Sequence, residues 1–85
     1  MKLRIKYFAS VRERFGIEQE IVDIDAPELT VDALRAHIAS RDERAAKALH
    51  TDVLIRAAVN QEMVDGGFVV RGDSEIAFFP PVTGG

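Results

Sequence analysis

The chain has 85 residues, of which 47% are hydrophobic and 29% are charged, a composition typical of one globular domain and not of a disordered segment. Its net charge of −3 gives no electrostatic reason to bind nucleic acid, and no apolar run approaches the roughly 20 residues of a membrane span. Because cysteine is absent, disulfides and thiolate chemistry are excluded, and we expect a cytoplasmic protein without nucleic-acid or membrane partners.

Two strands are predicted at the start of the chain. Residues 2–8 are predicted to form the first strand, because basic and apolar side chains alternate strictly up to Tyr7, which is typical of a half-buried strand. Phe8 falls on the basic face, where this pattern would place a polar residue. Residues 18–25 alternate again, and we expect them to pair antiparallel with the first strand. The side chains expected to face the core from the first strand are Leu3, Ile5 and Tyr7.

Three helices are predicted. Residues 10–13 fit a capping box that opens a short helix, which Gly16 can close. Thr30 is expected to cap the most clearly amphipathic helix, over residues 31–39. A second capping box predicts a helix over residues 41–50, which we expect to be peripheral because its apolar face is narrow.

The rest of the chain is predicted to be mostly strand. Apolar alternation indicates a strand over residues 53–59, a turn at Asn60 and Gln61, and a very short strand at 63–64. A last strand is expected over residues 75–79. This order of elements predicts an α+β roll, in which a mixed sheet packs on one main helix. The helix supplies a crossover, so the first and last strands can pair in parallel.

Residues 1–79 are expected to form this domain, and residues 80–85 a flexible, extended C-terminal tail. Pro80 and Pro81 offer no N–H, so the sheet cannot continue through them. Six extended residues reach about 20 Å, far enough to place a carboxylate inside another protein. Gly84 and Gly85 would fit a narrow channel because they carry no side chain. The alternative interpretation is an ordinary frayed terminus.

An exposed aromatic pair is predicted beside this tail. If the first and last strands are parallel neighbours, Phe8 and Phe79 lie together on the exposed side of the sheet, where they would form a contact hot spot. The alternative is that a loop or the second helix covers them. Arg12 and Arg14 lie near that end and could pair with an acidic partner or remain solvated.

Catalytic machinery is nearly absent from the sequence. His37 and His50 lack the spacing of paired metal ligands, and no serine or threonine lies in a nucleophile elbow. A carboxylate is a poor electrophile, so chemistry at Gly85 needs prior activation, for instance as an acyl-adenylate. Another protein would have to supply the activating site.

The end of the chain closely resembles the small subunit of molybdopterin synthase, a ubiquitin-like β-grasp family of sulfur carriers. The resemblance also covers residues 7–13 and 58–61. The matching residues at the end are Phe78, Phe79, Pro80, Pro81, Val82, Thr83, Gly84 and Gly85.

This resemblance implies a non-catalytic carrier in molybdenum cofactor biosynthesis. An ATP-dependent enzyme would adenylate Gly85, and a sulfurtransferase would convert it to a thiocarboxylate. The tail would then enter the large synthase subunit, in a heterotetramer, and donate sulfur to cyclic pyranopterin monophosphate. The carrier itself would bind no cofactor or metal. The residues expected to contact the partner are Phe8, Arg12, Phe79, Pro80, Pro81, Val82 and Thr83, and Gly84 would give access to the reacting residue.

Three other functions remain open at this point. The chain could carry sulfur to thiamine, tRNA thiolation or cysteine, or it could be a protein modifier that forms amides with lysines. It could also be an interaction module whose tail never reacts. Deletion of Gly85 separates the last possibility from the others, because a module would still bind normally.

Overall fold

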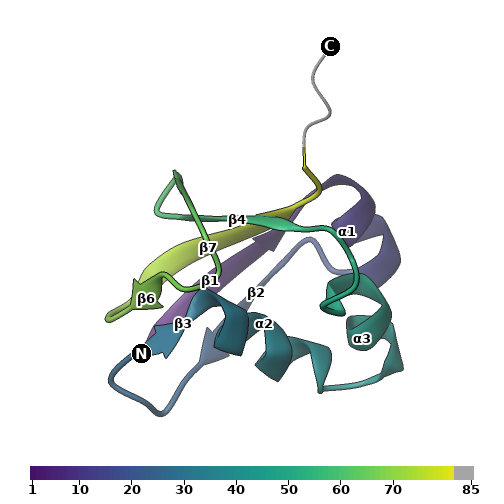
Figure 1. Cartoon of the computed structure of the whole chain (residues 1–85). Coiled ribbons are helices and arrows are strands. Elements are labelled where there is room, and N and C mark those ends of the chain that lie inside the picture. The colour runs from purple at the N-terminus through teal and green to yellow at the C-terminus, as the bar shows by residue number, and fades with distance from the viewer. Residues whose placement is uncertain (82–85) are drawn as a thin grey trace.

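The computed structural model describes residues 1–81, in which a β-sheet packs against a layer of helices (Figure 1). The predicted α+β roll is confirmed. In chain order the elements are β1 (Lys2–Tyr7), α1 (Ala9–Phe15), β2 (Gln19–Asp23), β3 (Leu29–Thr30), α2 (Val31–Ala39), α3 (Glu43–Leu49), β4 (Arg56–Val59), β5 (Glu62–Val64), β6 (Val69–Val70) and β7 (Ser74–Phe79).

The main sheet has the strand order β2-β1-β7-β4-β5. β1 pairs antiparallel with β2 and parallel with β7, as the sequence predicted, and Tyr7 lies opposite Phe78. β4 pairs antiparallel with the other side of β7 and places Arg56 opposite Phe79. β3 and β6 form a separate small antiparallel pair. The last strand of the chain is therefore held between two neighbours at the centre of the sheet.

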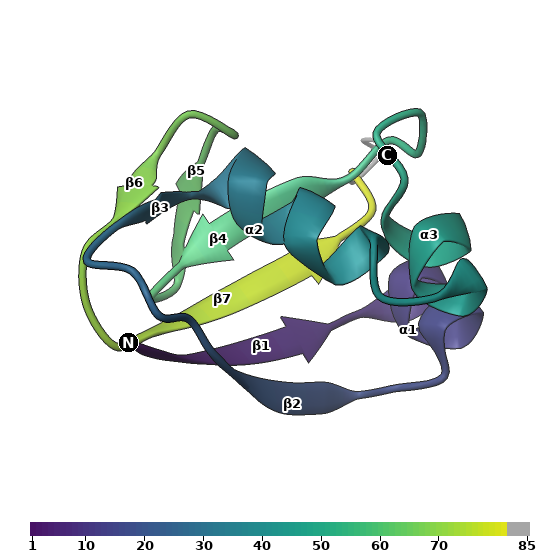
Figure 2. The same cartoon turned by 90° about the horizontal axis from the view of Figure 1, so that it is seen from below.

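The helices lie on one face of the sheet, and the core fills the space between them (Figure 2). Tyr7 lies at the centre of an aromatic group in this core. Its ring centroid is 4.8 Å from that of Phe15 and 6.3 Å from that of Phe78. The opposite face of the sheet, which the helices do not cover, is called the open face below. The fully buried larger side chains are Leu3, Ile5, Tyr7, Val11, Phe15, Leu34, Ile38, Leu49, Val70, Ile76 and Phe78.

Two local predictions are confirmed by hydrogen bonds and backbone angles. The Thr30 hydroxyl accepts a hydrogen bond from the Ala33 N–H at 3.0 Å, so Thr30 caps α2. Asn60 and Gln61 have φ values of 50° and 71°, which suit a tight hairpin turn between β4 and β5. The Asn60 side-chain oxygen also accepts from the Glu75 N–H at 3.0 Å, which ties this turn to β7.

The prediction that the third helix is peripheral is wrong. Three α3 side chains lie fully in the core: Ala45, Ala48 and Leu49. The small alanines let α3 approach its neighbours closely, so a narrow apolar face is enough to bury the helix. Its predicted capping box is also wrong. Asp42 is the N-cap, since its carboxylate accepts from the Ala45 N–H at 2.8 Å, and the helix begins at Glu43.

The predicted capping box of the first helix is wrong as well. Phe8 is the N-cap of α1, with no side-chain cap, and Ala9 has a φ of 50°. The chain turns here because the Phe8 N–H donates to the Phe78 carbonyl at 3.1 Å, which keeps Phe8 in the extended geometry of β1. Gly16 ends the helix with a φ of 78°, as predicted.

β4 begins at Arg56 and not at Val53 as predicted. The cause is Arg35 on α2, whose guanidinium donates to the backbone carbonyls of Leu49, His50 and Val53. These bonds hold the segment after α3 against α2, so it joins the sheet only at Arg56. Partial burial lowers the pKa of Arg35, and the nearby Asp32 carboxylate offsets part of this effect.

Candidate functional site

The candidate site lies where the chain leaves the end of β7. Phe79 is the last residue of that strand, and Pro80 and Pro81 follow it; all three are half-buried. These three residues are called the tail base below. Because β1 and β4 pair with β7 on its two sides, the tail base is fixed to the centre of the sheet. The remaining predicted tail residues lie outside the described residues: Val82, Thr83, Gly84 and Gly85.

The structure brings Phe8 and Phe79 to the same end of the open face. Tyr7 and Phe78 are opposite each other and point into the core, so the residue that follows each of them points to the other face. Phe8 is 44% exposed, which contradicts the alternative that a loop or helix covers it. The predicted position of this aromatic pair is thus confirmed, and its role in binding a partner stays a prediction.

A rigid layer lies beneath this pair, on the covered side of the sheet. The Tyr7 hydroxyl donates to the Glu20 carboxylate at 2.7 Å, and Arg41 pairs with the same carboxylate at 2.8 Å. Burial raises the pKa of Tyr7, and the hydrogen bond to Glu20 raises it further, so its phenol stays neutral. Tyr7 therefore supports the strands that carry the aromatic pair and does not act as an acid or base.

Arg12 lies beside Phe8, as the sequence predicted. Both residues line a shallow hollow of about 140 Å³ at this end of the sheet. The Arg12 guanidinium is 4.0 Å from the Glu18 carboxylate, at the limit of an ion pair, and its side chain is about half exposed. Arg12 is therefore available to a partner that covers Phe8.

Met63 extends the apolar surface across the open face, and the sequence analysis missed its role. Ala77 of β7 is paired with Ala58 of β4, which is paired in turn with Met63 of β5. The two alanines are small, so Met63, which is 58% exposed, projects from this row. The sequence contained a signal for this position. Residues paired across a hairpin share a face of the sheet, so the predicted turn at Asn60 and Gln61 places Met63 on the same face as Ala58.

Comparison with known proteins agrees with this geometry. The ThiS family pattern matches residues 5–85, which is nearly the whole chain. The chain belongs to the ThiS family.

The chain is similar to a bacterial relative and to two solved structures. The chain is 45% identical to the molybdopterin synthase sulfur carrier subunit of Escherichia coli (strain K12) over 83 residues, which make up 98% of this chain and 99% of the relative. The small archaeal modifier protein 1 of H. volcanii has a TM-score of 0.74 and 27% identity, over 95% of this chain and 98% of that one. A chain from the complex of subunits 1 and 2 of the molybdopterin-converting factor of Helicobacter pylori has a TM-score of 0.65 and full coverage of both chains, but at 18% identity it shows the fold alone.

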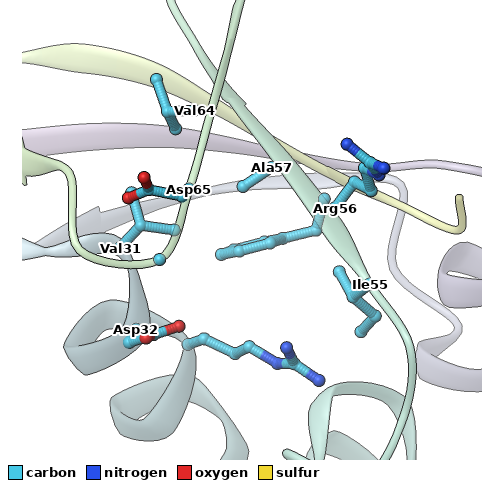
Figure 3. Close-up of a pocket in the computed structure, with 10 residues that line it drawn as sticks. Val31, Asp32, Ile55, Arg56, Ala57, Val64 and Asp65 are labelled. Atoms are coloured by element: carbon cyan, nitrogen blue, oxygen red, sulfur yellow. The ribbon is translucent and has the colours of Figure 1, made fainter.

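A second hollow, of about 240 Å³, lies on the covered side of this ThiS-family domain, between α2 and the β4–β5 hairpin (Figure 3). Two of its charged groups, Arg35 and Asp32, have structural roles. Arg35 is bound to backbone carbonyls, and Asp32 lies so close to Gly66 that a Cβ there would be 2.2 Å from its carboxylate. The described lining includes no hydroxyl, thiol or imidazole: Val31, Asp32, Arg35, Ile55, Arg56, Ala57, Val64, Asp65, Gly66 and Phe78. This hollow therefore offers no serine, threonine, cysteine or histidine nucleophile.

The described residues of this ThiS-family chain also contain no group of histidine, aspartate or glutamate side chains placed to hold a metal ion. His37 and His50 are both exposed. Within residues 1–81, no helix has the length and hydrophobicity needed to span a bilayer. Within residues 1–81, the surface around the tail base therefore remains the candidate functional site.

Proposed function

We propose that this chain is a sulfur carrier in molybdenum cofactor biosynthesis, the small non-catalytic subunit of a molybdopterin synthase. The observation that carries this proposal is the end-to-end match with the Escherichia coli sulfur carrier subunit. The position of the tail base supports it, because a strand at the centre of the sheet leads directly into Pro80 and Pro81 and then into the Gly84–Gly85 end of the sequence.

The reacting group in this proposal is the carboxylate of Gly85. An activating enzyme transfers AMP from ATP to this carboxylate and releases pyrophosphate, which converts a poor electrophile into an acyl-adenylate. A sulfurtransferase then supplies sulfur at the oxidation level of sulfide, this sulfur displaces AMP from the acyl carbon, and Gly85 becomes a thiocarboxylate. The carrier binds no cofactor of its own, since ATP belongs to the activating enzyme.

The acceptor in this proposal is cyclic pyranopterin monophosphate in the large synthase subunit, and the two subunits form a heterotetramer. The open face at the tail base is the docking surface, with Phe8 and Phe79 as its apolar centre and Arg12 at its edge. In this proposal Val82 and Thr83 contact the large subunit, and Gly84, which has no side chain, lets Gly85 enter a narrow channel. The Escherichia coli relative is named a subunit of molybdopterin synthase, which supports a large-subunit partner.

The test is the intact mass of the chain before and after incubation with ATP, an adenylating enzyme of the family and a sulfur donor. We expect a gain equal to one sulfur replacing one oxygen, mapped to Gly85 by fragmentation. A chain without Gly85 should show no gain and should keep its fold by circular dichroism. An unchanged mass, with a loading system that works on the Escherichia coli carrier, would contradict the proposal.

A second candidate function is protein modification, favoured by the similarity to the archaeal modifier protein. In that case the adenylated Gly85 would react with a lysine amine to form an amide, and no thiocarboxylate would be needed. A search by mass spectrometry for lysines linked to the Gly84–Gly85 end, after incubation with ATP and cell extract, separates the two functions.

A further inference from the structure

Arg56 lies on the open face beside the tail base. It is directly opposite Phe79 in the pairing of β4 with β7, so the Cβ atoms of the two residues are about 5 Å apart. Ala57 and Val59 of the same strand point into the core, so Arg56 points to the open face. Arg56 also borders the hollow of Figure 3, but its side chain is directed away from that of Ile55.

The charge of Arg56 is not neutralised within the described part of the chain. Lys6, on the same face, is 2.7 Å from the Glu75 carboxylate, and Arg12 has Glu18 at 4.0 Å. Among residues 1–81, Arg56 takes part in no ion pair and its side chain donates no hydrogen bond. The unpaired Arg56 guanidinium therefore lies beside the ring of Phe79, which we expect a partner to cover.

Leu54 is a second exposed residue in the segment that leads into β4. It lies two residues before Arg56 and is 77% exposed. Both views place the segment before β4 beside the end of β7 (Figures 1 and 2). A partner that covers Phe79 and Pro80 is therefore placed to contact this segment, which includes Leu54.

We propose that Arg56 is a specificity residue of the docking surface, which binds a carboxylate of the large synthase subunit while Leu54 packs against an apolar part of the same subunit. Any surface that excludes water from Phe79 also excludes it from Arg56. A guanidinium that loses water without gaining a partner costs affinity, so the subunit that fits must supply a carboxylate there. Arginine suits this role because its planar group can bind a carboxylate through two hydrogen bonds. This inference rests on the proposed function.

The test is a calorimetric titration of the chain with the large subunit of molybdopterin synthase. We expect Arg56→Glu to weaken binding by about 30-fold or more, and Arg56→Leu by about tenfold, because the partner carboxylate is then buried unpaired. Arg56→Lys should lose only a few-fold, since it keeps the charge but not the planar group. The wild-type affinity should fall with added salt more steeply than that of Arg56→Leu.

Lys47→Glu is the matched control. It makes the same change in net charge on α3, on the covered side of the molecule, and should leave the affinity within about twofold. If Lys47→Glu weakens binding as much as Arg56→Glu, the effect is one of net charge and the inference is wrong.

Phe79→Asp separates this inference from the proposed function. If Arg56→Glu binds like the wild type while Phe79→Asp loses affinity, the role of Arg56 is wrong and the docking surface stands. If neither variant loses affinity while Gly85 still becomes a thiocarboxylate, the docking surface and Arg56 both fall and the carrier function stands. Circular dichroism of each variant shows that the fold is retained.

Discussion

Phe78 and Phe79 are adjacent in the sequence, yet they belong to different surfaces of the molecule. Phe78 points into the core, where it stacks with Tyr7 and lies fully buried. Phe79 points to the open face and is only half-buried. The covered face is continuous and apolar, whereas the open face places a few apolar side chains among charged ones. We therefore expect stability and binding to depend on opposite faces of one strand, so that mutations can alter them separately.

Truncation of Phe78 should have the largest effect on stability. Phe78→Ala removes a buried ring and leaves a cavity next to Tyr7, which should lower the free energy of unfolding by about 3–5 kcal/mol. Urea denaturation followed by circular dichroism measures this loss. Because small domains are stable by only about 5–15 kcal/mol, the variant should be close to unfolding at room temperature. A loss below about 1 kcal/mol would show that the buried face does not carry the stability.

A charge at Phe79 should affect binding more than stability. Phe79→Asp places a carboxylate in the centre of the docking surface, and we expect it to weaken binding of the large subunit by more than about 2 kcal/mol. The free energy of unfolding should change by less than about 1 kcal/mol, because the side chain faces the open side. Calorimetric titration and urea denaturation give the two values on the same preparation.

Ile21→Asp is the control for this prediction. Ile21 is 65% exposed and lies on the same face, on the edge strand β2, but it is paired with Arg4, far from the tail base. The same change of chemistry there should leave the affinity unaltered. If Ile21→Asp and Phe79→Asp weaken binding equally, the partner covers the whole open face and the tail base has no special role.

The strands and the helix that separate the covered face from the open face could be predicted from the sequence, because their patterns lie within short segments. Strict alternation predicted β1, and Thr30 predicted the start of α2. The same alternation predicted that Phe8 and Phe79 lie on the exposed side of the sheet. The parallel pairing followed from the helical crossover between the two strands.

The features that the sequence analysis missed depend on contacts between distant residues. β4 begins late because Arg35 binds carbonyls 14 and 18 residues further along the chain. α3 is buried because its alanines allow close packing, which a hydrophobic pattern underestimates. Arg56 was predicted only as part of a strand, and the register with β7 shows that it lies beside Phe79. The reacting end of the tail lies outside the described residues, so its role is argued from family membership.

The smallest effect is expected at Tyr7, the buried residue that directly precedes the exposed Phe8. Tyr7→Phe removes the hydrogen bond to Glu20 but leaves Glu20 paired with Arg41, so the loss of stability should be about 1 kcal/mol. The pKa of Tyr7 is raised in the folded state, so the unfolded chain loses its phenol proton first as the pH rises past about 10. The wild type should therefore lose stability above that pH, and Tyr7→Phe should lose less.

Urea denaturation at neutral and alkaline pH measures this difference, and titration with the large subunit shows whether docking changes. Tyr7 is buried and directly precedes Phe8, but its side chain points to the opposite face, so a change of its hydroxyl should not reach the open face. Weaker binding by Tyr7→Phe at unchanged stability would mean that the buried layer positions the docking surface. The separation of the two faces would then hold for stability but not for binding.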